Sequence, residues 1–200
     1  GLGDVYKRQA QTFLEVKALE VAMAIENGAD EVDIVLNVGR MLTGEYDEAA
    51  NEVEVIRSEM DADVVLKVII ESGALKTPDL IRKASLLSMF AGADFVKTST
   101  GKIDVAATPE AAVVMCQAIR DYYQKTGRKV GFKAAGGVRT AEDAALYYTI
   151  VEEILGPEWL NTDMFRIGAS SAANNLLSAI EGREIKYYCC LLYTSPSPRD

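Results

Sequence analysis

Strand-like apolar runs alternate with helical patterns along most of this chain. The apolar runs cover residues 32–36, 64–70, 95–97, 130–133 and 165–168. The helical patterns cover residues 11–26, 46–59, 77–92, 108–127 and 140–155. Thr-Pro pairs open two of these helices and glycines follow several of them, which are usual start and stop signals. This alternation predicts βαβ units and therefore an α/β fold with a parallel sheet.

Each expected strand carries one charged residue near its middle or its carboxyl end. These residues are Asp33, Lys67, Lys97, Lys133 and Arg166. In a doubly wound sheet both faces are covered by helices, where such charges would be hard to satisfy. In a (β/α)8 barrel, alternate residues point into the interior, and catalysis takes place at the carboxyl ends of the strands. The sequence therefore predicts a TIM barrel, here incomplete, with about five of the eight strands that such a barrel has.

Two lysines, Lys97 and Lys133, lie inside segments that otherwise have the composition of buried strands. A buried ammonium group is costly unless it is paired. Burial and a second cation nearby both lower the pKa of a lysine, and a neutral lysine can attack a carbonyl carbon to form a Schiff base. The competing interpretation is a structural lysine paired with Asp33, and spacing alone leaves both interpretations open.

The amino-acid composition excludes several kinds of catalytic site and argues against several kinds of partner. The chain has no histidine, which excludes Ser-His and Cys-His nucleophile pairs and His-bearing zinc sites within this sequence. Its formal net charge of -9 and the absence of basic clusters argue against nucleic acid or an anionic membrane as a partner. Cys116 is the single cysteine away from the carboxyl-terminal end, so we expect a reducing compartment, the cytoplasm by default.

The two ends of the chain are related to each other. Residues 4–9 and 190–195 can be encoded by DNA strings that are reverse complements over most of their length. A transposon sequencing adapter read at both ends of a DNA fragment would produce this relation. We therefore expect residues 1–9 and 190–200 to be adapter-derived and residues 10–189 to form part of one barrel domain. On this interpretation the first three strands are missing, and the open sheet edges would favour aggregation and weak activity.

Several motifs follow one another in a recognisable order. They include Phe-Val-Lys-Thr-Ser-Thr-Gly-Lys at 95–102, Gly-Phe-Lys-Ala-Ala-Gly-Gly-Val-Arg at 131–139, and the segments 31–35, 66–71 and 165–171. Over roughly residues 10–180 the chain resembles the deoxyribose-phosphate aldolase family. That family consists of class I aldolases of TIM-barrel fold, which use no metal and no cofactor. They cleave 2-deoxyribose 5-phosphate to glyceraldehyde 3-phosphate and acetaldehyde.

The resemblance implies a role for three residues. Lys97 corresponds to the Schiff-base lysine, Lys133 to the neighbouring lysine that lowers its pKa, and Asp33 to the carboxylate of a proton relay. General acid–base groups of this kind agree with what a retro-aldol cleavage needs. Ala134 stands where a proline is common in the family, and we expect little effect from this difference.

A phosphate site is expected beside these residues. Glycines let backbone amides approach an anion closely, and the free N–H groups of a helix start favour one. Barrels often bind phosphate after their last two strands, although a Gly-Gly pair alone is more often a turn. The candidates are Gly136, Gly137, Gly168, Ser170 and Ser171, with Thr98, Ser99, Thr100 and Lys102 for substrate hydroxyls or carboxylate partners.

Two further cations are expected to support the site. Lys67 would hold Asp33 or Glu71 in place, and Arg166 would either form an internal ion pair or contact the phosphate. Two other functions remain open: another Schiff-base lyase of the same architecture, such as a transaldolase-like enzyme, and a non-catalytic phosphosugar-binding module. The expected partner is a small phosphorylated sugar, and a homo-oligomer is compatible with the sequence.

Overall fold

The computed structural model describes residues 13–169 and 172–186 of the chain. Both segments that we attribute to adapters, 1–9 and 190–200, lie outside the described residues, as do Ser170 and Ser171 of the expected phosphate site.

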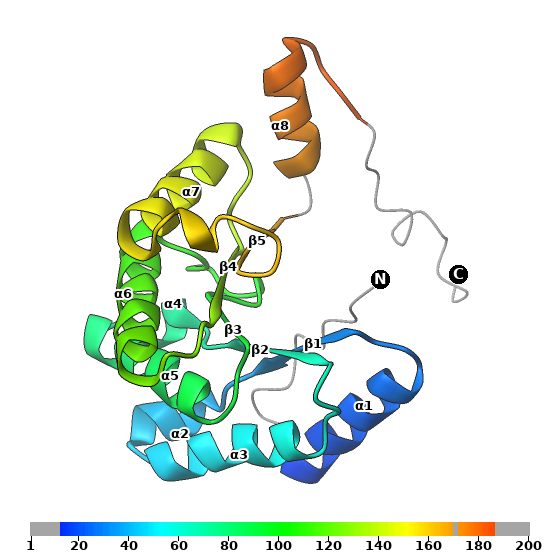
Figure 1. The fold of residues 1–200 in the computed structure, drawn as a ribbon, viewed down its shortest axis with the longest axis vertical. Coiled ribbons are helices and arrows are strands. Elements are labelled where there is room, and N and C mark those ends of the chain that lie inside the picture. The colour runs from blue at the N-terminus through cyan, green and yellow to red at the C-terminus, as the bar shows by residue number, and fades with distance from the viewer. Residues whose placement is uncertain (1–12, 170–171, 187–200) are drawn as a thin grey trace.

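A parallel five-stranded sheet forms the centre of the molecule (Figure 1). Its strands lie side by side in the order in which they occur in the sequence. They are β1 (Glu31–Val35), β2 (Val65–Ile69), β3 (Phe95–Lys97), β4 (Gly131–Ala135) and β5 (Phe165–Gly168). Sequential order with a helical crossover between every pair is the arrangement of consecutive units of a (β/α)8 barrel, since a doubly wound sheet reverses its order.

The helices lie around the outer side of this sheet (Figure 1). The longer ones are α1 (Leu14–Glu26), α3 (Tyr46–Ser58), α5 (Pro78–Phe90), α6 (Pro109–Thr126), α7 (Ala141–Leu155) and α8 (Ala172–Glu181). Thr77, Thr108 and Thr140 cap three of them, each accepting a hydrogen bond from a backbone N–H of the first turn. These caps explain why the predicted starts of α5, α6 and α7 agree with the structure to within one residue.

Short helices account for the elements that the sequence patterns did not predict. They are α2 (Val38–Thr43), α4 (Ser72–Leu75) and the 3-10 helix η1 (Pro157–Trp159). Each is too short to show a helical repeat of apolar residues, which is the signal on which the prediction depended. The apolar patterns themselves are confirmed, because every expected strand and longer helix is present in the described residues.

Alternate residues of the strands face opposite sides of the sheet, as the pleat requires. Val32, Ile34, Leu66, Val68 and Phe132 belong to the hydrophobic core between sheet and helices. The charged residues of the strands occupy the positions in between, on the inner side of the sheet.

The sheet is curved enough for its first and last strands to meet across this inner side. Arg166 Nη2 of β5 lies 2.9 Å from Glu31 Oε1 of β1, and Lys133 Nζ of β4 lies 2.8 Å from Asp33 Oδ2 of β1. A flat sheet with the order β1-β2-β3-β4-β5 would hold β1 and β5 about 19 Å apart, four strand spacings. The fold is therefore an incomplete (β/α)8 barrel, as the sequence predicts.

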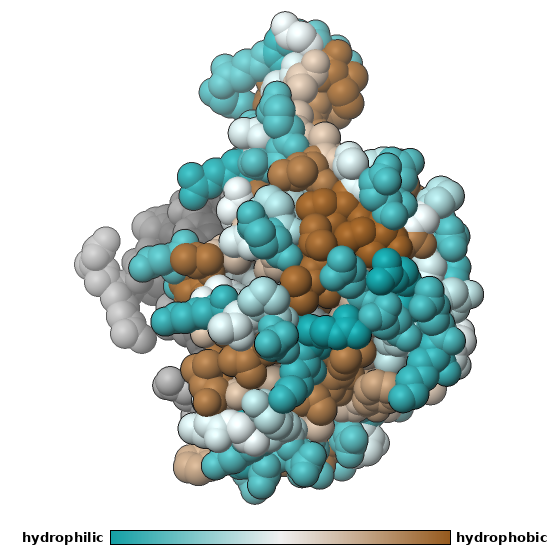
Figure 2. All heavy atoms as spheres, turned by 90° about the vertical axis from the view of Figure 1, so that its left-hand side faces the viewer, coloured by the Kyte–Doolittle hydropathy of each residue, from teal (hydrophilic) through white to brown (hydrophobic). Residues whose placement is uncertain are grey.

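Polar and hydrophobic residues are both present on the face of the molecule shown in Figure 2. Figure 2 views the side formed by the outer helices and shows a hydrophobic patch just below the projecting α8. Leu146 of α7 and Ile180 of α8 are among the exposed large apolar side chains. Within the described residues, no helix is long and apolar enough to cross a membrane.

Candidate active site

Three strands bring two lysines onto one carboxylate. Lys97 Nζ lies 2.7 Å and Lys133 Nζ 2.8 Å from the same oxygen of Asp33, Oδ2. Lys97 and Lys133 are direct neighbours in the pairing of β3 with β4, and Asp33 approaches them from β1. Lys97 and Asp33 are almost fully buried, with 2% and 4% of their surface exposed. The structure therefore brings together the three residues that the sequence nominates for catalysis.

Electrostatics favour the ionised form of the shared carboxylate. Burial alone would raise the pKa of Asp33, but attraction to Lys97 and Lys133 and hydrogen bonds from both lower it below its ordinary value. Asp33 Oδ1 is also 3.6 Å from Lys67 Nζ. The buried carboxylate of Asp33 thus faces three ammonium groups, those of Lys97, Lys133 and Lys67.

A second layer of charges lies nearer the amino ends of the strands, where Glu31 and Arg166 are partly exposed. Lys67 Nζ hydrogen bonds to Glu31 Oε2 at 2.5 Å, and Arg166 pairs with the other oxygen of Glu31 at 2.9 Å. Burial would raise the pKa of Glu31, but the hydrogen bond and charge of Lys67 and the charge of Arg166 lower it. Phe95 contributes its ring face, with Lys67 Nζ and Arg166 Cζ each 5.7 Å from the centroid.

This layer shows which partners Lys67 and Arg166 have among those that the sequence suggested. The acidic partners of Lys67 are Glu31 and Asp33, whereas Glu71 bonds to Ser99 and Thr100. Arg166 forms the internal ion pair. Both cations therefore have carboxylate partners within the described residues.

A cavity of about 490 Å³ opens above Lys97 and Lys133, at the carboxyl ends of β3, β4 and β5. Its volume lies within the usual range for small-ligand sites. It is lined by Lys97, Thr100, Gly101, Lys102, Lys133, Ala135, Gly136, Gly137, Val138, Arg139, Gly168 and Ala169. The glycines of the expected phosphate site and the expected nucleophile therefore share one cavity.

At two of these glycines, the Cβ of any other residue would come too close to neighbouring atoms. Gly136 has a φ of +86°, and a Cβ there would lie 2.6 Å from the Cβ of Ala106. At Gly168 a Cβ would lie 2.8 Å from the Cβ of Ala135 and 3.4 Å from Cε of Lys133. Glycine at 168 thus keeps room beside the Lys133 side chain.

The hydroxyl residues after Lys97 have protein partners. Thr98 Oγ1 donates to the carbonyl oxygen of Ala135 at 2.9 Å and accepts from the amide of the same residue at 2.9 Å. Ser99 and Thr100 donate to Glu71. Of the residues suggested for substrate hydroxyls, Thr100 and Lys102 line the cavity.

Glu31 and Arg139 were not predicted as site residues, and Glu71 was named only as a possible partner of Lys67. Glu31 lies two residues before Asp33 and therefore on the same strand face, a signal that was available in the alternation. Glu71 follows β2 at the carboxyl end of the sheet, where barrel sites are built. Arg139 lies within the 131–139 motif and lines the cavity.

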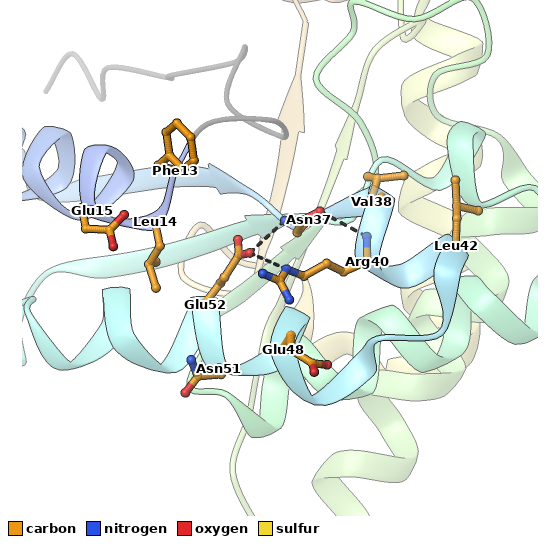
Figure 3. A pocket seen from close by; sticks show the side chains of 11 residues that line it. Phe13, Leu14, Glu15, Asn37, Val38, Arg40, Leu42, Glu48, Asn51 and Glu52 are labelled. Carbon is orange, nitrogen blue, oxygen red and sulfur yellow. Dashed lines mark hydrogen bonds and ion pairs between the residues drawn. The ribbon is translucent and has the colours of Figure 1, made fainter.

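A larger cavity of about 720 Å³ lies outside the barrel interior, between the starts of α1, α2 and α3. Figure 3 shows Glu52 at its centre, bonded to Asn37 and Arg40. Glu52 also accepts a hydrogen bond from buried Lys17 at 3.2 Å. We place the chemistry in the smaller cavity, because it contains the paired lysines and the glycine loops together.

The fold and this cavity define a barrel protein with an amine-bearing site at the carboxyl ends of its strands. The sequence pattern described as DeoC/LacD family aldolase matches residues 3–154. The chain therefore belongs to the DeoC/LacD family of aldolases.

Individual relatives agree with this assignment. Deoxyribose-phosphate aldolase of Mus musculus is 47% identical over 178 residues, covering 89% of this chain and 54% of its own length. The enzyme of that name from Agrobacterium fabrum is 46% identical over 165 residues, covering 82% of this chain and 62% of its own. The chain thus spans about half to three fifths of these relatives.

Solved structures show the same fold. A putative deoxyribose-phosphate aldolase from Coccidioides immitis superposes with a TM-score of 0.74 at 31% identity, covering 88% of this chain and 63% of that one. A putative deoxyribose-phosphate aldolase from Toxoplasma gondii superposes with a TM-score of 0.73 at 25% identity, covering 86% and 67%.

Proposed function

We propose that this protein is a Schiff-base aldolase that reversibly cleaves 2-deoxy-D-ribose 5-phosphate to D-glyceraldehyde 3-phosphate and acetaldehyde. The observation that carries the proposal is the contact of Lys97 and Lys133 with one oxygen of Asp33, at 2.7 and 2.8 Å, beside a cavity lined by glycine loops. Family membership and the names of the relatives support it.

The first step is imine formation at Lys97. Its neutral amine attacks C1 of the open-chain sugar, and the resulting carbinolamine loses water to give a protonated imine. Burial of Lys97 and the neighbouring Lys133 ammonium both favour the neutral amine, whereas Asp33 favours the ammonium form. The protonated imine is the electron sink that the cleavage needs.

Cleavage follows between C2 and C3. A base removes the proton of the C3 hydroxyl, the C2–C3 electron pair moves towards the imine nitrogen, and glyceraldehyde 3-phosphate leaves. The enamine that remains is protonated at C2, and water then hydrolyses the imine to release acetaldehyde and the lysine amine. Asp33 and Lys133 are the proton carriers that this site offers, directly or through water.

The phosphate end of the substrate needs its own partners. Gly136, Gly137 and Gly168 expose backbone along one wall of the cavity, and Lys102 and Arg139 supply positive charge. We assign the phosphate to this wall. Ser170 and Ser171 remain candidates from the sequence.

The proposed oligomeric state rests on one relative and on exposed apolar side chains. A deoxyribose phosphate aldolase from Aeropyrum pernix, 29% identical with a TM-score of 0.64, is described as a tetramer. Together with the exposed apolar side chains of α7 and α8, this supports a homo-oligomer for the present protein.

The test is a cleavage assay in which 2-deoxyribose 5-phosphate is converted and acetaldehyde is quantified. We expect acetaldehyde and glyceraldehyde 3-phosphate in equal amounts, and covalent labelling of the protein by acetaldehyde plus borohydride. Transfer of a three-carbon ketone unit without acetaldehyde release would indicate a transaldolase-like enzyme instead. Binding of the sugar phosphate without labelling would indicate a non-catalytic module.

A further inference from the structure

Glu71 is a buried carboxylate with an unusual backbone conformation. It lies two residues after the end of β2, has φ 52° and ψ 58°, and is 6% exposed. Left-handed backbone is uncommon for a residue other than glycine and persists only where the surroundings fix it. The next residue helps to fix it, because the amide of Ser72 donates to the carbonyl oxygen of Thr98 at 2.9 Å.

The carboxylate is satisfied by the segment that follows the nucleophile strand. Ser99 Oγ donates to Glu71 Oε1 at 2.5 Å, and Thr100 Oγ1 donates to Glu71 Oε2 at 2.6 Å. The amide of Thr100 also donates to Oε1 at 3.1 Å. Charge-assisted hydrogen bonds of this kind are about twice as strong as neutral ones. A single carboxylate therefore holds both hydroxyl residues.

These hydroxyls in turn order the next residues. Ser99 Oγ accepts a hydrogen bond from the amide of Gly101 at 3.0 Å, and Thr100 Oγ1 accepts one from the amide of Lys102 at 3.2 Å. A hydroxyl has one proton, so a hydroxyl that donates to Glu71 presents its lone pairs to these amides. Glu71 thus fixes the turn formed by residues 99–102.

The turn rests on the wall to which we assign the phosphate. A Cβ built at Gly136 would lie 3.1 Å from Cα of Gly101, so the two loops are in direct contact. Thr100, Gly101 and Lys102 line the same cavity as Gly136. A shift of the turn would therefore move the Lys102 ammonium and the glycine wall relative to each other.

We propose that Glu71 is a positioning residue for the substrate phosphate, acting through the 99–102 turn on Lys102 and Gly136. The proposal rests on the function proposed above and deepens it by naming what sets the preference for a phosphorylated over a non-phosphorylated sugar. Glu71 does not contact the reacting carbon atoms in this account. Its loss should therefore affect recognition of the phosphate more than imine formation at Lys97.

The test variant is Glu71→Gln, which keeps the size of the side chain and removes one of its two acceptor oxygens. Glu52→Gln is the matched control, because Glu52 is another buried carboxylate with several hydrogen bonds. It does not line the 490 Å³ cavity that contains Lys97. Each protein is labelled by a brief borohydride pulse with acetaldehyde, 2-deoxyribose or 2-deoxyribose 5-phosphate. The concentration that gives half-maximal labelling is measured for each sugar.

For Glu71→Gln we expect the half-maximal concentration of 2-deoxyribose 5-phosphate to rise about tenfold or more, with a much smaller change for 2-deoxyribose. In Glu52→Gln, the ratio of the half-maximal concentrations of 2-deoxyribose and 2-deoxyribose 5-phosphate should be the same as in the wild type. Thr100→Val, which removes one donor to Glu71, should change the ratio in the same direction. This second variant tests the proposal should Glu71→Gln fail to fold.

Two different results would contradict these proposals, and each one contradicts a different proposal. A wild-type protein that acetaldehyde does not label would overturn the proposed function, and the role of Glu71 with it. If acetaldehyde labels the wild type, and the ratio of half-maximal concentrations for the two sugars is unchanged in both Glu71→Gln and Thr100→Val, only the role of Glu71 is overturned.

Discussion

In the part of the chain that the structure describes, a buried lysine meets a carboxylate in two clusters, and the clusters differ in what surrounds the pair. Lys17 is 1% exposed and bonds to Glu52, which also accepts from Asn37 and Arg40 between the outer helices. Lys97 is 2% exposed and bonds to Asp33 inside the barrel. Burial of the lysine is therefore the same in both.

The difference lies in the neighbouring charge and in access. Around Lys97, a second lysine shares the same carboxylate oxygen, and the pair lines a cavity with an open side. At Glu52 the second cation, Arg40, binds the other carboxylate oxygen from the one that Lys17 binds. Lys17 does not line the neighbouring cavity, and its ammonium is also 3.5 Å from the carbonyl oxygen of Val35. A buried lysine is thus a candidate nucleophile only where a like charge opposes its protonation and a substrate can reach it.

The largest effect that sharpens this comparison is expected at the shared carboxylate. Asp33→Asn keeps the shape of the side chain and removes its basicity, so proton transfer should slow by about 10²-fold or more while imine formation survives. The readout is exchange of solvent deuterium into the methyl group of acetaldehyde, followed by NMR, beside borohydride trapping. Equal loss of exchange and trapping would mean that Asp33 serves folding or binding instead.

Removal of the neighbouring cation should have a smaller effect. Lys133→Leu takes a like charge away from Lys97, so the pKa of Lys97 should rise and less neutral amine should be present near pH 7. The rate of acetaldehyde labelling, measured against pH, should then begin to rise at a higher pH than in the wild type. Coincident profiles for wild type and variant would show that Lys133 does not tune the nucleophile.

The sequence predicted this inner cluster but not everything around it. Lys97 and Lys133 were recognisable because a charge in an apolar strand is conspicuous, and period-two alternation placed Asp33 on the same face. Glu71 was named only as a possible partner of Lys67. Its contacts with Ser99 and Thr100 could not be predicted, since they depend on a left-handed backbone and on a turn 28 residues away in the sequence. The Lys17–Glu52 pair was missed for a similar reason, because it joins two helices whose exposed faces carry many charges.

Acid should weaken the inner cluster. The pKa of Asp33 is lowered in the folded protein, so its contribution to stability is present above the unfolded pKa of about 4 and is lost as the pH falls through the folded value. The difference in unfolding free energy between wild type and Asp33→Asn should therefore shrink on going from pH 6 towards pH 2. Chemical denaturation at several pH values measures it, and a difference that grows in acid would contradict the ion-pair account.

The smallest effect on chemistry is expected in the outer cluster. Lys17→Met should leave acetaldehyde labelling unchanged while it lowers the free energy of unfolding by about 1–3 kcal/mol, because Glu52 loses one donor and keeps Asn37 and Arg40. Denaturant titration and labelling stoichiometry are measured on the same preparation. A loss of labelling without a loss of stability would show that the two clusters are not separate.

The most direct measurement is to locate the label itself. The protein is treated with acetaldehyde and borohydride, digested, and searched by mass spectrometry for ethylated lysine, in the wild type and in Lys97→Met. We predict one ethyl group per chain at Lys97, none at Lys17, and no stoichiometric label in the variant. A full label that persists in Lys97→Met and maps to Lys133, Lys67 or Lys17 would contradict the assignment of Lys97 as the nucleophile.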